Sequence, residues 1–209
     1  NEKFNLNQRL TFLLKEIRET ERGRELILSR ADPEIVVKLF AREVPEINSG
    51  AVEIKAIARE AGNRTKIAVF STQSGVDPVG SCVGQKGVRV QAVINELNEE
   101  KIDVIPYSEN VENFITSALS PAEGVSIRLN EKEQVATVVV PDTQLSLAIG
   151  KEGQNARLAS KLTKWKIEIE GAPVEQKVKV DEVEKETDEQ TTNNPEPESL
   201  KPEPDNNEK

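Results

Sequence analysis

Two short glycine-rich segments are the residues of this chain whose type and spacing best suit binding chemistry. The first is VGQKGVRVQAVINEL (residues 83–97) and the second is IGKEGQNARLASKL (residues 149–162). Each is an apolar residue followed by Gly-x-x-Gly and an amphipathic run. Glycine has no Cβ, so the turn is tight and its N–H groups are accessible, while the N-terminus of the next helix carries partial positive charge. Such a loop can clamp the phosphate backbone of a nucleic acid whose bases lie in an apolar groove beside it.

The side chains around the two turns predict which residues would contact such a backbone. Lys86 and Arg89 flank the first turn, where each can attract phosphate. Lys151 and Arg157 flank the second turn in the same way. Glu152 lies inside the second turn, so either its side chain points away or this turn binds RNA more weakly than the first. The predicted RNA-binding residues are Val83, Gly84, Gln85, Lys86, Gly87, Arg89, Ile149, Gly150, Lys151, Glu152, Gly153 and Arg157.

The composition excludes several kinds of catalytic site. Histidine is absent, which removes Ser-His-Asp and Cys-His arrangements and the commonest metal ligand. The single cysteine, Cys82, cannot form an internal disulfide or a cysteine-rich zinc site, and a small buried hydrophobe is the expected role. A carboxylate pair could still act as acid and base, but none stands out among the 37 acidic residues. We therefore expect no catalytic residue, no metal site and no cofactor, in a protein that is not an enzyme.

Two units with the same order of elements position the glycine turns. The apolar periodicity and the turn signals predict α-β-β-α-turn-α-β in each. In the first unit these elements are residues 31–44, 51–60, 64–71, 77–84, 87–98 and 101–107, the second of them ambiguous beyond its opening alternation. In the second unit they are residues 110–120, 124–130, 134–142, 143–150, 153–163 and 165–171. A lone Gly-x-x-Gly is usually no more than a tight turn between helices, whereas two copies in one context favour a shared binding role.

The C-terminal part of the chain has a different composition. Residues 172–209 hold 12 acidic residues and five lysines, with no periodic apolar face, which predicts a disordered acidic tail. A second interpretation is an electrostatic decoy that competes with an anionic ligand for the basic surface. No apolar run approaches the ~20 residues that a membrane helix needs, and no secretory signal opens the chain.

Both units resemble the KH domain in its bacterial, type II arrangement, and the resemblance covers nearly their full length. RTKIAVFSTQSGVDPVGSCVGQKGVRVQAVINELNEEKIDVIPYS and VVVPDTQLSLAIGKEGQNARLASKLTKWKIEIEG in tandem further resemble one family of bacterial transcription elongation, termination and antitermination factors. The resemblance implies an α+β fold of two tandem type II KH domains (α-β-β-α-α-β), at residues 31–107 and 108–171. It also implies that residues 1–30 are the C-terminal part of an S1 (OB-fold) domain, whose last hairpin turns near residues 21–23, and that residues 172–209 are the disordered tail.

The same resemblance implies a function without catalysis. The chain would be a cytoplasmic protein that holds nascent single-stranded RNA near RNA polymerase and modulates pausing, termination and antitermination. Its implied partners are RNA, RNA polymerase (mainly through an N-terminal domain outside this chain) and other antitermination factors, with no membrane and a monomeric state. Only about three residues separate the two units, too few for a flexible tether, so we expect the units to pack together.

Two other classes of function stay open at this point. The chain could be the RNA-binding appendage of an RNA-processing enzyme such as polynucleotide phosphorylase, a KH/S1 exoribonuclease. In that enzyme one KH domain precedes S1, whereas here an S1-like segment precedes two KH-like units. The chain could also be a nucleotide-binding enzyme, but residues 84–87 lack the G-x-x-x-x-G-K-[ST] pattern that a phosphate loop requires.

Overall fold

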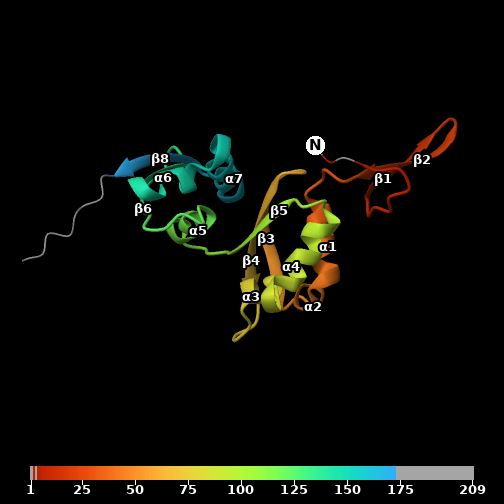
Figure 1. Cartoon of the computed structure of the whole chain (residues 1–209), viewed down its shortest axis with the longest axis horizontal. Coiled ribbons are helices and arrows are strands. Elements are labelled where there is room, and N and C mark those ends of the chain that lie inside the picture. The colour runs from red at the N-terminus through yellow and green to blue at the C-terminus, as the bar shows by residue number, and fades with distance from the viewer. Residues whose placement is uncertain (1, 3, 173–209) are drawn as a thin grey trace, which may run out of the picture. The chain divides into compact units, whose positions relative to one another are not determined.

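The computed structural model describes residue 2 and residues 4–172 of the chain (Figure 1). The predicted acidic tail lies outside the described residues except for Ala172, which ends the last strand. Among the described residues, no helix is both long enough and apolar enough to cross a bilayer. The elements are β1 (Leu13–Thr20), β2 (Gly23–Ser29), α1 (Glu34–Glu43), α2 (Pro45–Asn48), β3 (Val52–Glu60), β4 (Arg64–Ser71), α3 (Pro78–Val83), α4 (Val88–Glu96), β5 (Lys101–Pro106), α5 (Val111–Ala118), β6 (Ser126–Asn130), β7 (Val135–Pro141), α6 (Asp142–Ile149), α7 (Gln154–Thr163) and β8 (Lys166–Ala172), with 3₁₀ turns η1 (Gln85–Gly87) and η2 (Lys151–Gly153).

The first unit is a three-stranded sheet with helices packed against it. Its central strand, β4, is antiparallel to β3 and parallel to β5. Asp32 helps to start α1 by accepting a hydrogen bond from the Glu34 amide at 3.0 Å. The part of β3 that the sequence left ambiguous is regular strand, because β3 pairs with β4 through Glu60. The core consists of Ile35, Val36, Leu39, Phe40, Val44, Val52, Ile67, Val69, Cys82, Val93 and Leu97.

The second unit repeats this architecture. The central strand β7 is antiparallel to β6 and parallel to β8. Strict alternation along β7 buries Ala136, Val138 and Val140 on one face of the strand. Asn110 caps α5 by accepting a hydrogen bond from the Asn113 amide at 2.9 Å. Both units therefore have the predicted α-β-β-α-α-β order, and the α+β fold class is confirmed. The first unit adds one short helix, α2, that the sequence did not predict.

The two units share a hydrophobic core, as the short joint between them predicts. Ala58, Ala68 and Ile105 of the first sheet belong to the same buried cluster as Phe114 and Leu162 of the second unit. A buried lysine of β4, Lys66, adds a polar bridge, because its Nζ donates to the Ser120 carbonyl at 2.9 Å and lies 3.1 Å from the Asp103 carboxylate. The apolar contacts exclude water from this joint, so the units are fixed by packing rather than tethered.

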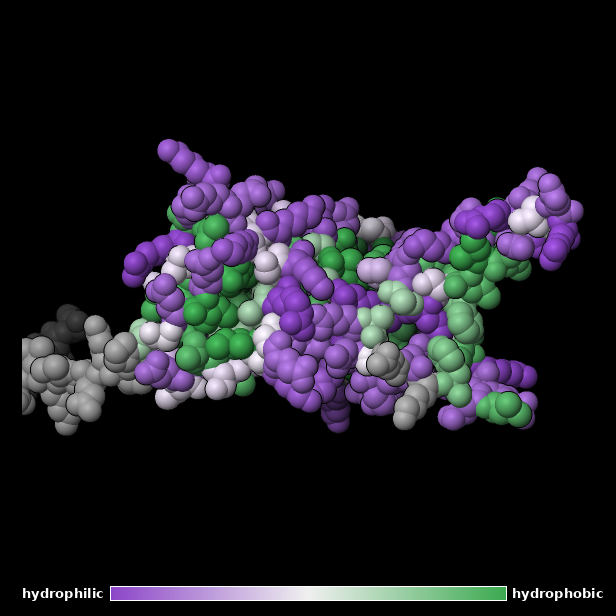
Figure 2. Space-filling view, turned by 90° about the horizontal axis from the view of Figure 1, so that it is seen from above, coloured by the Kyte–Doolittle hydropathy of each residue, from purple (hydrophilic) through white to green (hydrophobic). Residues whose placement is uncertain are grey.

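An antiparallel hairpin of β1 and β2 precedes the first unit, with its turn at Glu21 and Arg22. Several apolar side chains of the hairpin are exposed, namely Leu14, Ile17, Leu26 and Leu28, and so is Phe12 directly before it. Figure 2 shows apolar residues gathered along this N-terminal part of the chain. The buried Arg30 guanidinium, which donates to the carbonyls of Thr11 and Glu96, holds the base of the hairpin against α4.

Candidate nucleic-acid interface

The two glycine turns have the same backbone geometry. We call residues 84–87 the first loop and residues 150–153 the second loop. The φ and ψ angles are 74° and 173° at Gly84, and 73° and 173° at Gly150. The third residue is left-handed in both loops, with φ of 53° at Lys86 and at Glu152. The final glycines are left-handed as well. Two separate sequences thus fold into one unusual shape.

Glycine is required at the start of each loop for two reasons. A φ near 74° with ψ near 173° is a region that only glycine populates readily. A Cβ on Gly84 would also lie 2.8 Å from Cγ of Arg89, and one on Gly150 would lie 2.8 Å from the backbone nitrogen of Asn155. Each loop therefore turns with its first glycine pressed against the following helix.

Each loop leads directly into a helix whose first turn can attract an anion. α4 begins at Val88 and α7 at Gln154, one residue after the last glycine of each loop. The first amides of a helix have no partner within that helix, and they carry the positive end of its dipole. Both loops therefore combine close backbone approach with a local positive potential, which suits a phosphate group.

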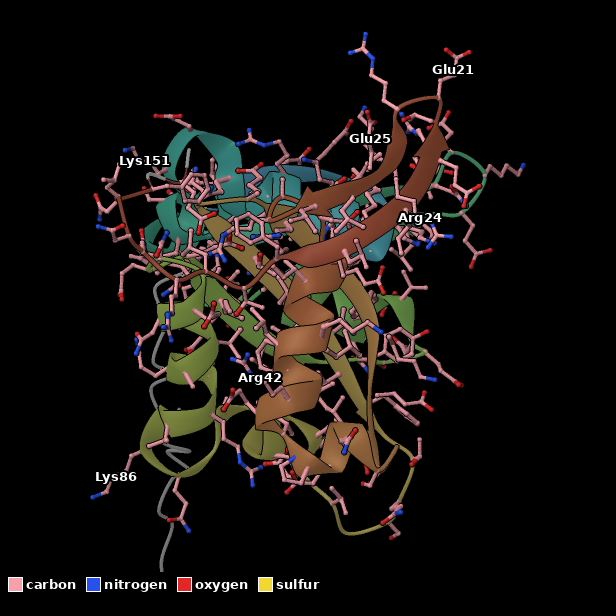
Figure 3. The ribbon with its side chains drawn as sticks, turned by 90° about the vertical axis from the view of Figure 1, so that its right-hand side faces the viewer. Glu21, Arg24, Glu25, Arg42, Lys86 and Lys151 are labelled. Carbon is pink, nitrogen blue, oxygen red and sulfur yellow. The ribbon has the colours of Figure 1, made fainter. Side chains whose placement is uncertain are left out.

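The side chains in the middle of the loops extend into solvent. Gln85, Lys86, Lys151 and Glu152 are exposed. Figure 3 shows Lys86 and Lys151 reaching outward from the ribbon. The first loop therefore presents one cation and no acid, whereas the second presents Lys151 beside the carboxylate of Glu152.

The apolar residues that precede the loops differ in exposure. Val83 is half-buried at the end of α3, and Ile149 is 38% exposed at the end of α6. The sequence missed a third apolar side chain, Val88, which is 67% exposed directly after the first loop. The sequence signal that could have identified Val88 is an apolar residue immediately after the second glycine of the loop.

Arg89 is engaged within its own domain. Its Nη1 donates to the Glu46 carboxylate at 2.9 Å and to the Ser81 carbonyl at 2.7 Å. Hydrogen bonds from the backbone amide of Glu46 itself and from Arg89 hold the pKa of Glu46 below its ordinary value, against the opposing effect of burial. No sequence signal indicated this carboxylate, because α2, which carries it, was not predicted.

The residue equivalent to Arg89 in the second unit is Asn155, not Arg157. Asn155 follows Gly150 by five positions, as Arg89 follows Gly84. It is buried, and its Nδ2 donates to the carbonyls of Leu119, Leu147 and Ala148. Arg157 lies further along α7, where its Nε donates to the Glu60 carboxylate of β3 at 2.7 Å. The two arginines that the sequence paired therefore occupy different structural positions.

A groove of about 700 Å³ opens beside the first loop. Its walls come from α2, from the residues before α3, from α3 itself, from the first loop and from the start of α4. This volume is within the range of small-molecule sites, and the groove is wide open to solvent, as an extended ligand would require. The lining residues are Glu46, Gly75, Val76, Asp77, Gly80, Ser81, Gly84, Gln85, Val88 and Arg89.

The repeated α-β-β-α-α-β unit, with a glycine loop between its last two helices, defines a tandem pair of type II KH domains. Models of known families agree: residues 30–107 match the NusA-like first KH domain and residues 111–177 match the NusA-like second KH domain. The chain belongs to the NusA family.

Curated relatives give the same assignment. The chain is 50% identical over 169 residues to "Transcription termination/antitermination protein NusA" of Halalkalibacterium halodurans, which covers 81% of this chain and 44% of that protein. The protein of the same name from Bacillus subtilis is 51% identical over 169 residues, covering 81% of this chain and 46% of that protein. The protein of the same name from Mycobacterium tuberculosis is 55% identical over 147 residues, covering 70% of this chain and 42% of that protein. The chain thus spans less than half the length of these relatives.

Proposed function

We propose that this chain binds single-stranded RNA through its two KH loops, without catalysing a reaction. The observation that carries the proposal is the pair of loops with one backbone geometry, each opening a helix. Each KH loop clamps about four nucleotides, so the pair would hold roughly eight or more. All twelve residues predicted from the sequence belong to the proposed interface. Gln85, Lys86 and Lys151 would meet phosphate directly, while Arg89 and Arg157 would support the loops.

We infer the cellular role from the relatives, which are named as transcription termination/antitermination proteins. In this role the chain would hold nascent RNA near RNA polymerase in the cytoplasm. Holding the RNA there would modulate transcriptional pausing, termination and antitermination. RNA polymerase and other antitermination factors would be the protein partners of a monomer. Residues 1–30 would complete an S1 domain, and their uncovered apolar side chains support this role for the hairpin.

Loop variants test RNA binding directly. Replacing Gln85 and Lys86 together by Asp, or Lys151 and Glu152 together by Asp, places two carboxylates where phosphate would lie. Because Asp tolerates the left-handed conformation, the loop backbone should survive. Each double substitution should weaken binding of a twelve-nucleotide single-stranded RNA, measured by fluorescence anisotropy, and the combination should abolish it. The control is Lys132→Asp, an exposed lysine in the β6–β7 turn outside both loops.

Unchanged affinity in the combined variant, with an unchanged circular dichroism spectrum, would refute the assignment. Two further assays separate the alternative functions. An RNA-processing enzyme would shorten the RNA during the incubation, and a nucleotide-binding enzyme would bind ATP with an affinity that the loop substitutions reduce. We expect intact RNA and no ATP binding.

A further inference from the structure

A single carboxylate of the first KH domain interacts with three side chains of the second domain. Glu60, the last residue of β3, accepts hydrogen bonds from Nε of Arg157 at 2.7 Å and from Nε2 of Gln154 at 2.8 Å. Nζ of Lys161 lies 3.9 Å from the same carboxylate. Residues 154, 157 and 161 follow one face of α7, which packs on β3. Glu60 therefore fixes α7 close to its N-terminal end, where the second loop ends.

Arg157 extends this connection into the second loop. Its Nη1 donates to the Glu152 carbonyl at 3.1 Å, while Nε and Nη2 face Glu60. Glu152 is the left-handed residue of the loop, a conformation that costs a non-glycine residue about 1–2 kcal/mol and therefore needs support. The rigid fork of a guanidinium can hold both oxygen partners at once, which a lysine ammonium at the same position cannot do with the same geometry.

The first loop is supported differently. The Arg89 side chain lies where a Cβ on Gly84 would collide with it, and it donates hydrogen bonds to Glu46 and to the Ser81 carbonyl, all within the first domain. In the second loop, Asn155 occupies the position of Arg89. The left-handed residue Glu152 is instead supported by Arg157, which is anchored on Glu60 of the first domain. The two loops thus share one shape and differ in what holds that shape.

We propose that Arg157 is a positioning residue that makes the RNA-binding geometry of the second loop depend on Glu60 of the first KH domain. The inference rests on the proposed RNA-binding function of the second loop. It assigns the Glu60–Arg157 pair a coupling role between the two RNA sites, in place of the direct phosphate contact that the sequence predicts for Arg157.

The direction in which one substitution changes RNA affinity distinguishes a positioning role of Arg157 from a phosphate contact. Glu60→Ala removes a negative charge near the proposed RNA path and frees the Arg157 guanidinium. If Arg157 were a phosphate contact, this variant would bind RNA more tightly, with a salt dependence steeper by about one phosphate contact. If Arg157 is a positioning residue, the variant should bind a twelve-nucleotide RNA about three- to tenfold more weakly, with no steeper salt dependence.

The matched control is Glu34→Ala, which removes a carboxylate of another ion pair in the same domain, 3.6 Å from Lys38 and on α1. It should leave RNA affinity unchanged. Arg157→Lys keeps the charge but loses the two-sided contact, so it should weaken binding as much as Arg157→Ala. Full retention of affinity in Arg157→Lys would overturn the proposal.

A measurement without RNA tests the same inference. Amide hydrogen exchange at residues 150–153 should become faster in Glu60→Ala, while exchange at residues 84–87 stays unchanged. Unchanged exchange in the second loop would overturn the coupling. In the variant with Asp at positions 151 and 152, adding Glu60→Ala should cause no further loss of RNA affinity, because the loop that it supports is already disabled. A further loss of the same size would contradict the proposal.

Failure of the proposed function is distinguishable from failure of this inference. If the second loop does not bind RNA, the Asp substitutions at 151 and 152 themselves leave affinity unchanged. If that loop does bind RNA and Glu60→Ala has no effect on affinity, only the coupling role is wrong.

Discussion

At the scale of single residues, Lys86 and Glu152 offer a direct comparison of opposite charges in one conformation. They occupy the same position in the two loops, with ψ of 24° and 28° and the same φ of 53°. Exchanging their side chains therefore changes charge without changing backbone strain. This pair lets electrostatics be measured separately from shape.

We predict that Glu152→Lys tightens single-stranded RNA binding and that Lys86→Glu weakens it, because each alters the charge that faces phosphate. The slope of log K against log salt concentration should change by about 0.7 for each phosphate whose neutralisation is added or removed. Binding titrations over a range of salt concentrations measure both quantities. The double exchange keeps the net charge constant and serves as the control. Identical salt dependence in all four proteins would show that neither side chain faces RNA.

At the scale of elements, the loop glycines should differ in how strongly they resist substitution. Gly87 and Gly153 are left-handed with nothing nearer than 4.0 Å to an added Cβ, so Gly→Ala there should lower the free energy of unfolding by about 1–2 kcal/mol. Gly84→Ala and Gly150→Ala should cost more, because the backbone region is unfavourable and the Cβ collides. Gly150→Ala should be the worst, since it meets backbone atoms rather than a flexible side chain.

Urea unfolding of the four variants measures these costs. Equal losses at all four glycines would contradict the rigid loop geometry described above. The affinity of Gly87→Ala for RNA is then measured at a temperature where this variant is folded. A loss of affinity under that condition reports a change in the first loop and not unfolding of the domain.

The helices and strands could be predicted from local sequence patterns. The contacts that hold the two loops in place could not. Apolar periodicity and turn signals predicted the helices and strands of both units, and the Gly-x-x-Gly spacing predicted both loops, because each of these signals lies within a few neighbouring residues. The helix α2 was missed, since four residues carry too little periodicity, and Glu46 was missed with it. The contacts of Arg89 with Glu46 and of Arg157 with Glu60 join residues far apart in sequence, so no local pattern indicates them.

At the scale of the whole molecule, the shared core of the two KH domains predicts that they unfold together. The chain provides one natural probe in each domain. The single tryptophan, Trp165, packs against the core of the second domain, and the single cysteine, Cys82, is fully buried in the first. Burial raises the pKa of the Cys82 thiol to about 12, so the folded protein presents neither an accessible thiol nor a thiolate.

We expect Trp165 fluorescence and Cys82 labelling to report one unfolding midpoint in urea, because the common core makes the two domains a single cooperative unit. Two separate midpoints would contradict this. The measurement should be made near neutral pH. The stability that Cys82 contributes as a buried neutral thiol is present below the ordinary thiol pKa of about 8.5, and it is lost as the pH rises toward 12.

The proposal that the two loops form the RNA-binding surface is tested most directly by mapping the backbone amides that respond to RNA. In a nuclear magnetic resonance titration with a twelve-nucleotide single-stranded RNA, we predict the largest chemical-shift changes at residues 83–89 and 149–155. The exposed hairpin turn at Glu21 and Arg22 serves as the internal reference and should shift little. Large changes confined to the hairpin, or to one domain only, would contradict an RNA-binding surface formed by both loops.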